Sequence, residues 1–101
     1  MVVLTNRGSF SAANDFALIM KAFPYVKLIG DRTGGGGGFP INSELPNGWT
    51  YRFSSNLTLS PDSFNVENGI PPDIKVDLKK SDEDIGIDTI IEEALKFILN
   101  S

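Results

Sequence analysis

The sequence contains neither cysteine nor histidine. The lack of cysteine excludes disulfide scaffolds, thiolate metal sites and cysteine nucleophiles. The lack of histidine removes the other usual zinc ligand and the most frequent catalytic base, so we expect neither a metal site nor a cofactor. Long hydrophobic runs are also missing, and no segment has the length and apolar content of a membrane-spanning helix.

Positive charge is scarce as well. Nine Lys and Arg residues stand against 13 Asp and Glu residues, which gives a net charge of −4. Proteins that bind nucleic acid need a cationic surface, so we expect no nucleic-acid partner. The hydrophobic content of 41% is that of an ordinary globular protein, and 101 residues fit one domain or a piece of one. The first residues read as a strand and lack the basic flank of a signal peptide, so we interpret residues 1–101 as a single partial domain.

The first thirty residues predict a strand, a helix and a second strand. Residues 2–4 and 26–29 are short apolar runs of the kind found in buried strands. Between them, residues 11–23 carry apolar side chains at helical spacing, and Pro24 follows. The members of that stripe are Phe16, Ile19, Met20 and Phe23. We expect a right-handed crossover that joins two parallel strands.

The rest of the chain predicts a turn-rich middle and a final helix. The glycine run, residues 34–38, predicts a flexible or close-approach loop. Asn47-Gly48 is a hairpin-turn signal, and the alternating aromatic stripe after it is interpreted as core (Trp49, Tyr51 and Phe53). Ile74 and Val76 suggest one more short strand, and residues 86–100 predict a helix with an acidic first turn. The fold class is therefore α/β, with a small mixed sheet and two main helices.

Three further motifs have ordinary explanations. The glycine run leads into Phe39-Pro40 and not into a helix, which argues against a phosphate-binding loop. The acidic run 82–84 is interpreted as a solvated helix start and not as a metal site. Asn56-Leu57-Thr58 fits the glycosylation pattern, but so short a pattern occurs often by chance and carries little weight.

The stretch "NRGSFSAAND", residues 6–15, leaves two interpretations open. Serine is a preferred helix N-cap, and taken alone Ser9 or Ser11 would be a cap. The order of buried strand, Gly-containing turn and helix is also one that exposes a nucleophile at a helix N-terminus. There the free N–H groups, that of Ala12 among them, can stabilise an oxyanion.

Four segments in order complete a resemblance. They are "VVLTNRGSFSAANDFALIMKAF", "VKLIGDRTGGGGGFP", "LPNGWTYRFSS" and "NVENGIPPDIKVDL". Together they resemble the C-terminal half of the catalytic domain of tail-specific (C-terminal processing) serine peptidases. That family includes the tricorn peptidase core and the interphotoreceptor retinoid-binding proteins.

The resemblance implies the C-terminal part of a crotonase/ClpP-like domain that hydrolyses a peptide or protein substrate. It implies Ser11 as nucleophile, Ala12 as donor of an oxyanion N–H, and Glu67 as the acidic residue that orients the base. Ser9 becomes a turn residue. Bacterial members are usually periplasmic, extracellular or attached to the cell envelope, which gives the expected location of the full-length protein.

The general base is missing from this pattern. The lysine of the processing branch falls at or near Gly36, and the guanidinium of Arg32 does not deprotonate. Lys21 and Lys27 lie away from the Ser11 turn. The resemblance is therefore to the tricorn-like branch, whose histidine would lie before Met1, and we expect the chain alone to be inactive.

Two other function classes stay open. One is a non-catalytic ligand-binding domain on the same fold, and the other is an assembly domain. For all three function classes, we expect the rest of the catalytic domain to be a partner of this chain. A homo-oligomer is also a reasonable expectation.

Overall fold

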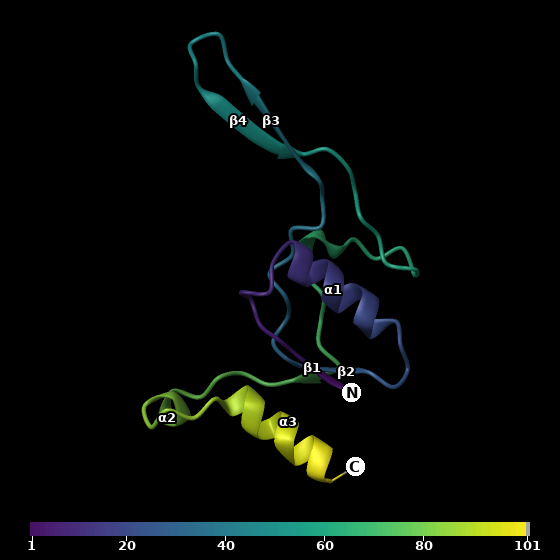
Figure 1. The fold of residues 1–101 in the computed structure, drawn as a ribbon, viewed down its shortest axis with the longest axis vertical. Coiled ribbons are helices and arrows are strands. Elements are labelled where there is room, and N and C mark those ends of the chain that lie inside the picture. Colours follow the sequence, from purple (N-terminus) through teal and green to yellow (C-terminus); the bar gives the residue numbers. More distant parts are fainter. Residues whose placement is uncertain (101) are drawn as a thin grey trace.

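The computed structural model describes residues 1–100, and its centre is a sheet of three parallel strands (Figure 1). These are β1 (Val2–Thr5), β2 (Lys27–Gly30) and β5 (Ile74–Lys75), in the order β1-β2-β5. Val2 pairs with Lys27, and Ile29 pairs with Ile74. The predicted pair of parallel strands is confirmed, and so is the short strand near Ile74.

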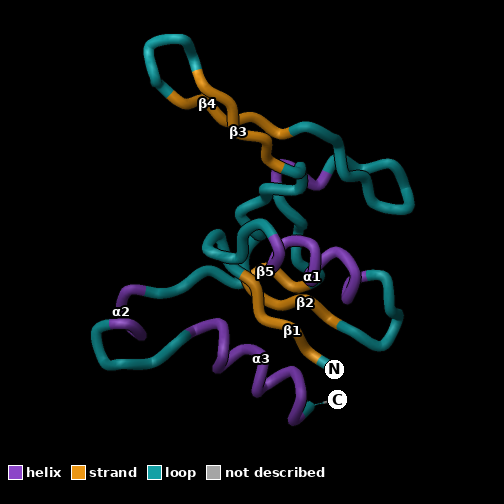
Figure 2. The backbone as a smooth tube through the Cα atoms, turned by 45° about the horizontal axis from the view of Figure 1, so that its top comes forward, coloured by secondary structure: helices purple, strands orange, loops and turns teal. Residues whose placement is uncertain are grey.

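Two helices lie on opposite sides of this sheet (Figure 2). They are α1 (Ala12–Lys21) and α3 (Thr89–Leu99). Successive residues of a strand point to opposite faces of the sheet, and Leu28 and Ile29 are both 0% exposed. Both faces of β2 are therefore covered, which explains why β2 is a continuous apolar run and not an alternating one. The main core lies on the α1 side and consists of Ala17, Val26, Leu28, Val66 and Ile70.

Most of the apolar stripe of residues 11–23 does not pack on the sheet, and only Met20 of its four members packs partly buried against the core. Phe16 is 53% exposed and Ile19 is 60% exposed, whereas Asn14 and Ala17 are buried. The predicted helix is confirmed, but three of the four residues of its apolar stripe are exposed within residues 1–100. Small and polar residues let α1 approach the sheet closely, and Leu18 and Met20 pack partly buried against the core. The side chains of Phe16 and Ile19 remain exposed.

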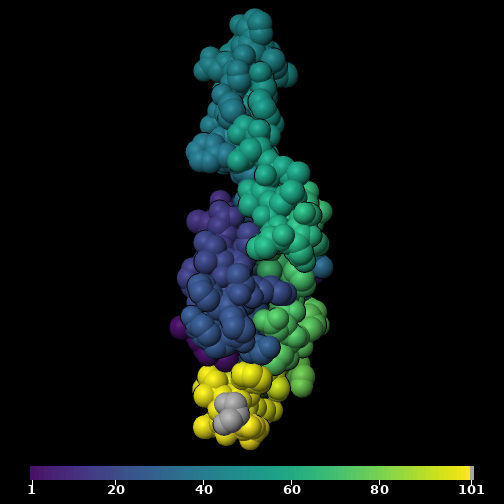
Figure 3. Space-filling view, turned by 90° about the vertical axis from the view of Figure 1, so that its right-hand side faces the viewer, coloured from purple at the N-terminus to yellow at the C-terminus, as the bar shows by residue number. Residues whose placement is uncertain are grey.

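A hairpin projects from this body (Figures 1 and 3). It pairs β3 (Pro40–Glu44) with β4 (Thr50–Ser54) in antiparallel register, and its turn contains the predicted Asn47-Gly48. Every residue of both strands is exposed, and the Trp49 side chain is 70% exposed. The interpretation of the aromatic stripe as core is therefore wrong within the described chain, because nothing in residues 1–100 packs over the hairpin.

The predicted α/β class is confirmed, with the parallel and antiparallel pairings in two separate small sheets. At the C-terminal end, a short helix α2 (Lys80–Glu83) precedes α3. The acidic run thus lies in and just after α2, and not in the first turn of α3 as expected. Asp88 caps α3 by accepting the N–H groups of Ile90 and Ile91 at 2.9 and 3.1 Å. None of the helices within residues 1–100 combines the length and the apolar content needed to cross a bilayer.

Candidate active site

Ser11 has a strained backbone at the start of α1. Its φ of 58° and ψ of −115° lie in a region that favours glycine, which carries no Cβ. Although Ser11 occupies the N-cap position, its side chain makes no capping hydrogen bond. The helix-cap interpretation is therefore wrong for Ser11. A non-glycine residue in such a conformation costs about 1–3 kcal/mol, and such residues cluster at functional sites.

The neighbouring serine has the turn role that the sequence suggested. The Oγ of Ser9 accepts the N–H of Asn6 at 3.2 Å, and the Ser9 N–H donates to the carbonyl of Asn6 at 2.9 Å. Ser9 thus closes the turn between β1 and α1 and is half-buried. It fixes the path of the chain that presents Ser11 to solvent.

The N-terminus of α1 offers a backbone donor next to Ser11. The first N–H groups of a helix have no partner within the helix, and the Ala12 N–H makes no hydrogen bond elsewhere in residues 1–100. The positive end of the helix dipole lies at the same place. An oxygen that gains negative charge beside Ser11 would therefore find one free donor and a favourable field.

The glycine run passes between the turn of Ser11 and the turn of Glu67. The Ser11 N–H donates to the carbonyl of Gly35 at 2.9 Å, and the Gly36 N–H donates to the carbonyl of Glu67 at 3.3 Å. A Cβ on Gly35 would stand 1.9 Å from the carbonyl oxygen of Glu67. The run is therefore a close-approach loop, one of the two forms that the sequence allowed.

Glu67 lies in the short helix η1 (Val66–Asn68), on the far side of the glycine run from Ser11. Its carboxylate Oε2 accepts the N–H of Gly38 at 3.2 Å, and its own N–H donates to Asn65 Oδ1 at 3.0 Å. The carboxylate is exposed, so it remains available to a further partner. The structure thus brings Ser11, Ala12 and Glu67 to one region. The glycine run, residues 34–38, lies between Ser11 and Glu67.

Gly36 lies at or near the position where the resemblance places the lysine of the processing branch. Its φ is +82°, and a Cβ there would meet the Phe10 ring at 2.7 Å. The ring fills the space that a side chain from this position would need. Within residues 1–100, the run supplies no base to Ser11.

The other basic side chains are held elsewhere. Lys21 lies ten residues further along α1, about 15 Å from Ser11 along the helix axis, and its Nζ donates to the carbonyl of Pro71 at 2.5 Å. Lys27 begins β2, whereas the Ser11 turn follows the carboxyl end of β1. Arg32 Nη1 lies 3.4 Å from the carbonyl of Asn68, to which it donates. These positions agree with the expectation that none of the three activates Ser11.

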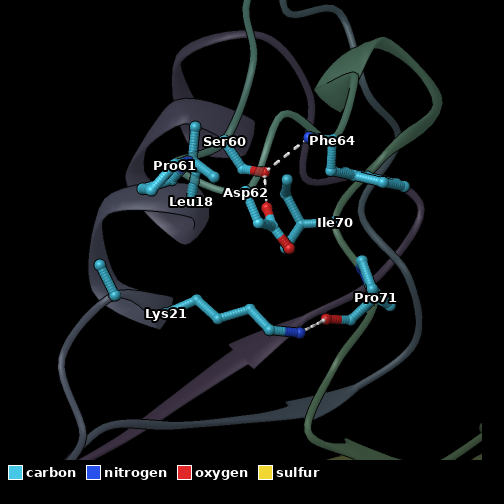
Figure 4. A pocket seen from close by; sticks show the side chains of 9 residues that line it. Leu18, Lys21, Ser60, Pro61, Asp62, Phe64, Ile70 and Pro71 are labelled. Carbon is cyan, nitrogen blue, oxygen red and sulfur yellow. Dashed lines mark hydrogen bonds between the residues drawn. The ribbon is translucent and has the colours of Figure 1, made fainter.

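An apolar cavity of about 350 Å³ lies at the opposite end of α1 from Ser11 (Figure 4). Lys21 spans one side of it toward Pro71, and Asp62 and Ser60 line another part. The cavity includes neither Ser11 nor Glu67. Its location does not decide the active site, because acyl transfer depends on the nucleophile and its hydrogen-bond donors and not on the presence of a nearby cavity.

Sequence inspection missed a buried polar network that supports the site. Asn14 is 0% exposed, and its amide donates to the carbonyl of Val66 at 3.2 Å. Its Oδ1 accepts the hydroxyl of Thr33 at 2.5 Å, and Thr33 Oγ1 in turn accepts the N–H of Ile70 at 2.6 Å. The network ties α1, the segment before the glycine run, and η1 together. Asparagine inside a helix is an unfavourable choice, and that is the one signal the sequence offered.

Asp31 forms ion pairs with two cations near the site. Its carboxylate contacts Lys75 Nζ and, at 2.9 Å, Arg7 Nε. The hydrogen bond from Lys75, followed by that from Arg7, lowers the pKa of Asp31 from 3.8 to about 2. Asp31 is therefore ionised at neutral pH, and it holds both cations at the carboxyl ends of the parallel strands.

Residues 1–76 match the profile of peptidase family S41. The curated "Probable CtpA-like serine protease" of Staphylococcus aureus strain COL is 30% identical over 79 residues. That alignment spans 77% of this chain and 16% of the relative.

Solved structures agree with this match. A candidate peptidase from Parabacteroides merdae is 50% identical, with a TM-score of 0.92 over 97% of this chain and 31% of that one. The tricorn protease is 29% identical, with a TM-score of 0.80 over 98% of this chain and 10% of that one. The chain therefore spans less than a third of each of these proteins. Since the profile matches 76 of the 101 residues, the chain belongs to peptidase family S41.

Proposed function

We propose that this chain carries the nucleophile of a serine peptidase. The observation that supports the proposal is the state of Ser11, which has a strained backbone, an exposed side chain and no capping hydrogen bond, at the free N-terminus of a helix. A helix cap needs none of the strain, and a nucleophile gains from it because the side chain projects out of the turn. Family membership gives the chemistry in which such a serine acts.

The reaction would follow the acyl-enzyme route. A base takes the proton of Ser11 Oγ as the oxygen attacks the carbonyl carbon of the peptide. The Ala12 N–H stabilises the oxyanion, and collapse of the tetrahedral intermediate breaks the C–N bond as the amine leaves with a proton from the base. Water, activated by the same base, then hydrolyses the ester on Ser11. Glu67 orients the base and stabilises its charged form.

The base itself comes from outside residues 1–100. The sequence has no histidine, and the lysines and arginines near the site are bonded elsewhere or remote. A serine hydroxyl without an adjacent base is a weak nucleophile. We therefore propose that the chain alone is inactive and becomes part of an active site when a base-bearing segment of a larger catalytic domain packs against it.

The surface of the chain supports such packing. The radius of gyration is 16.9 Å, against about 13 Å for a compact domain of this length. The accessible surface is 6871 Å², whereas a compact monomer of 11.0 kDa would expose about 5,600 Å². Large apolar side chains on α1 and on the hairpin contribute to this excess. We propose that the rest of the catalytic domain covers them, with a second copy of the chain as the alternative occupant.

A fluorophosphonate probe tests the proposal, because it reacts with activated serines. We expect slow labelling of the isolated chain, and faster labelling when imidazole is added as a substitute base. Ser11→Ala should abolish the imidazole-dependent labelling, and Ser9→Ala should retain it, since Ser9 only holds the turn. Fast labelling of Ser11 without imidazole would show that the chain contains its own base. Imidazole-dependent labelling at another serine would refute Ser11 as the nucleophile.

A further inference from the structure

A cleft of about 280 Å³ lies beside the candidate active site and is rich in cationic side chains. Its lining includes Arg7, Arg32 and Lys75, with Asp31 as its one acidic member. Arg7 follows β1, Arg32 follows β2, and Lys75 ends β5. The carboxyl ends of parallel strands meet at one edge of a sheet, which is the usual location of ligand sites in open α/β sheets. In a chain of net charge −4, this local excess of positive charge stands out.

Both arginines have donors to spare. Arg7 uses Nε on Asp31, and Arg32 uses Nη1 on the carbonyl of Asn68. Hydrogen bonds from the remaining guanidinium nitrogens are not found within residues 1–100. A guanidinium offers a planar pair of N–H groups that matches a carboxylate, which accepts two of them side by side. Lys75 is paired with Asp31 and Asp77, so the two arginines are the donors that remain for a ligand.

The cleft adjoins the turns that carry the catalytic candidates. Arg7 is four residues before Ser11 in the same turn, so their Cα atoms are at most about 14 Å apart. Arg32 bonds to Asn68, the residue after Glu67. An extended peptide lying over Ser11 therefore reaches the cleft within about four residues.

We propose that this cleft binds a carboxylate of the peptide substrate and selects peptides that carry one a few residues from the scissile bond. The inference rests on the proposed function of the chain as part of a peptidase. Asp31 has a supporting role, because it fixes the directions of Arg7 and Lys75. Asp31 and Asp77 together offset two of the three positive charges, and the free guanidinium donors of Arg7 and Arg32 remain for a ligand. The carboxylate is either the C-terminus of the substrate or an Asp or Glu side chain, and the experiment below distinguishes the two.

Binding of fluorescein-labelled octapeptides to the 101-residue chain, followed by anisotropy, tests this inference. Four peptides of one sequence combine a free or amidated C-terminus with Glu or Gln at one position. We expect the peptide with neither carboxylate to bind at least about tenfold more weakly than the peptide with both, because a charge-assisted hydrogen bond is lost. Loss of affinity on amidation alone identifies the terminal carboxylate, and loss on Glu-to-Gln exchange alone identifies the side chain. Affinity should also fall as salt is added.

Protein variants supply the matched controls. Arg32→Gln should weaken binding of the acidic peptide about tenfold, whereas Lys27→Gln removes the same charge at the amino end of β2 and should change it less than about twofold. Equal affinity for all four peptides, no binding of any peptide, or equal losses in the two variants would overturn the inference. The peptide comparison uses the unaltered chain, so a folding defect cannot imitate it. Because binding requires no cleavage, its outcome is independent of the Ser11 labelling that tests the proposed function.

Discussion

Replacement of Ser11 by alanine and by glycine separates a strained nucleophile from a helix cap. A serine that caps a helix stabilises the protein by about 1 kcal/mol relative to alanine. Ser11 makes no capping bond, so Ser11→Ala should change the free energy of unfolding by less than about 0.5 kcal/mol. Ser11→Gly should instead stabilise the chain, because glycine accepts a φ of 58° without the clash of a Cβ.

The size of the gain follows from two opposing terms. Relief of the strained conformation contributes about 1–3 kcal/mol. The greater freedom of glycine in the unfolded chain costs about 0.5–1 kcal/mol. The net gain is about 1 kcal/mol, which corresponds to a rise of roughly 4–8 °C in the melting temperature of a domain of this size.

Urea and thermal unfolding of the wild-type chain and its variants, followed by circular dichroism, provides the measurement. Ser63→Gly is the matched control, because Ser63 also has a positive φ, 67°, but lies outside the candidate site. We expect both glycine variants to gain stability and only Ser11→Gly to lose imidazole-dependent labelling. A loss of 1 kcal/mol or more in Ser11→Ala would restore the cap interpretation and refute the argument from strain.

Three further predictions concern the residues around Ser11. Gly35→Ala should destabilise the chain by more than about 3 kcal/mol in an equilibrium unfolding experiment, because the new Cβ would overlap the carbonyl of Glu67. Gly48→Ala is the control: its Cβ would have no neighbour within 4 Å, and the substitution should cost only about 1 kcal/mol. Thr33→Val leaves the buried Asn14 Oδ1 and the Ile70 N–H without their partner and should cost about 2–4 kcal/mol. Within residues 1–100 the Thr58 hydroxyl makes a single hydrogen bond, to the carbonyl of Gly37, so an equal cost for Thr58→Val would show that the network has no special role. Asp31 has a folded-state pKa below its unfolded value, so its contribution, about 1 kcal/mol after screening, is present above pH 3.8 and is lost as the pH falls toward about 2. The stability difference between the wild-type chain and Asp31→Asn should therefore shrink across that window, and a constant difference would contradict the ion-pair assignment.

Much of the secondary structure could be predicted because it depends on local spacing. Apolar runs gave β1 and β2, helical periodicity gave α1 and α3, and Asn47-Gly48 gave the hairpin turn. The candidate catalytic residues came from motif order, and their roles remain predictions. What could not be predicted was which surfaces are covered, because periodicity identifies an apolar face without identifying its partner. The exposed aromatic residues of the hairpin and the exposed Phe16 and Ile19 of α1 are the two cases.

The sequence by itself determined the α/β class, the family resemblance, the absence of an internal histidine base and the position of Ser11 after a strand and before a helix. Only the tertiary structure decided that Ser11 is strained and does not cap α1, and that the glycines at 34–38 let two turns approach through a space with no room for side chains. Only the fold brought Asn14 to Val66, 52 residues away. Local propensity acts over a few residues, whereas burial, backbone strain and long-range hydrogen bonds depend on where distant segments meet.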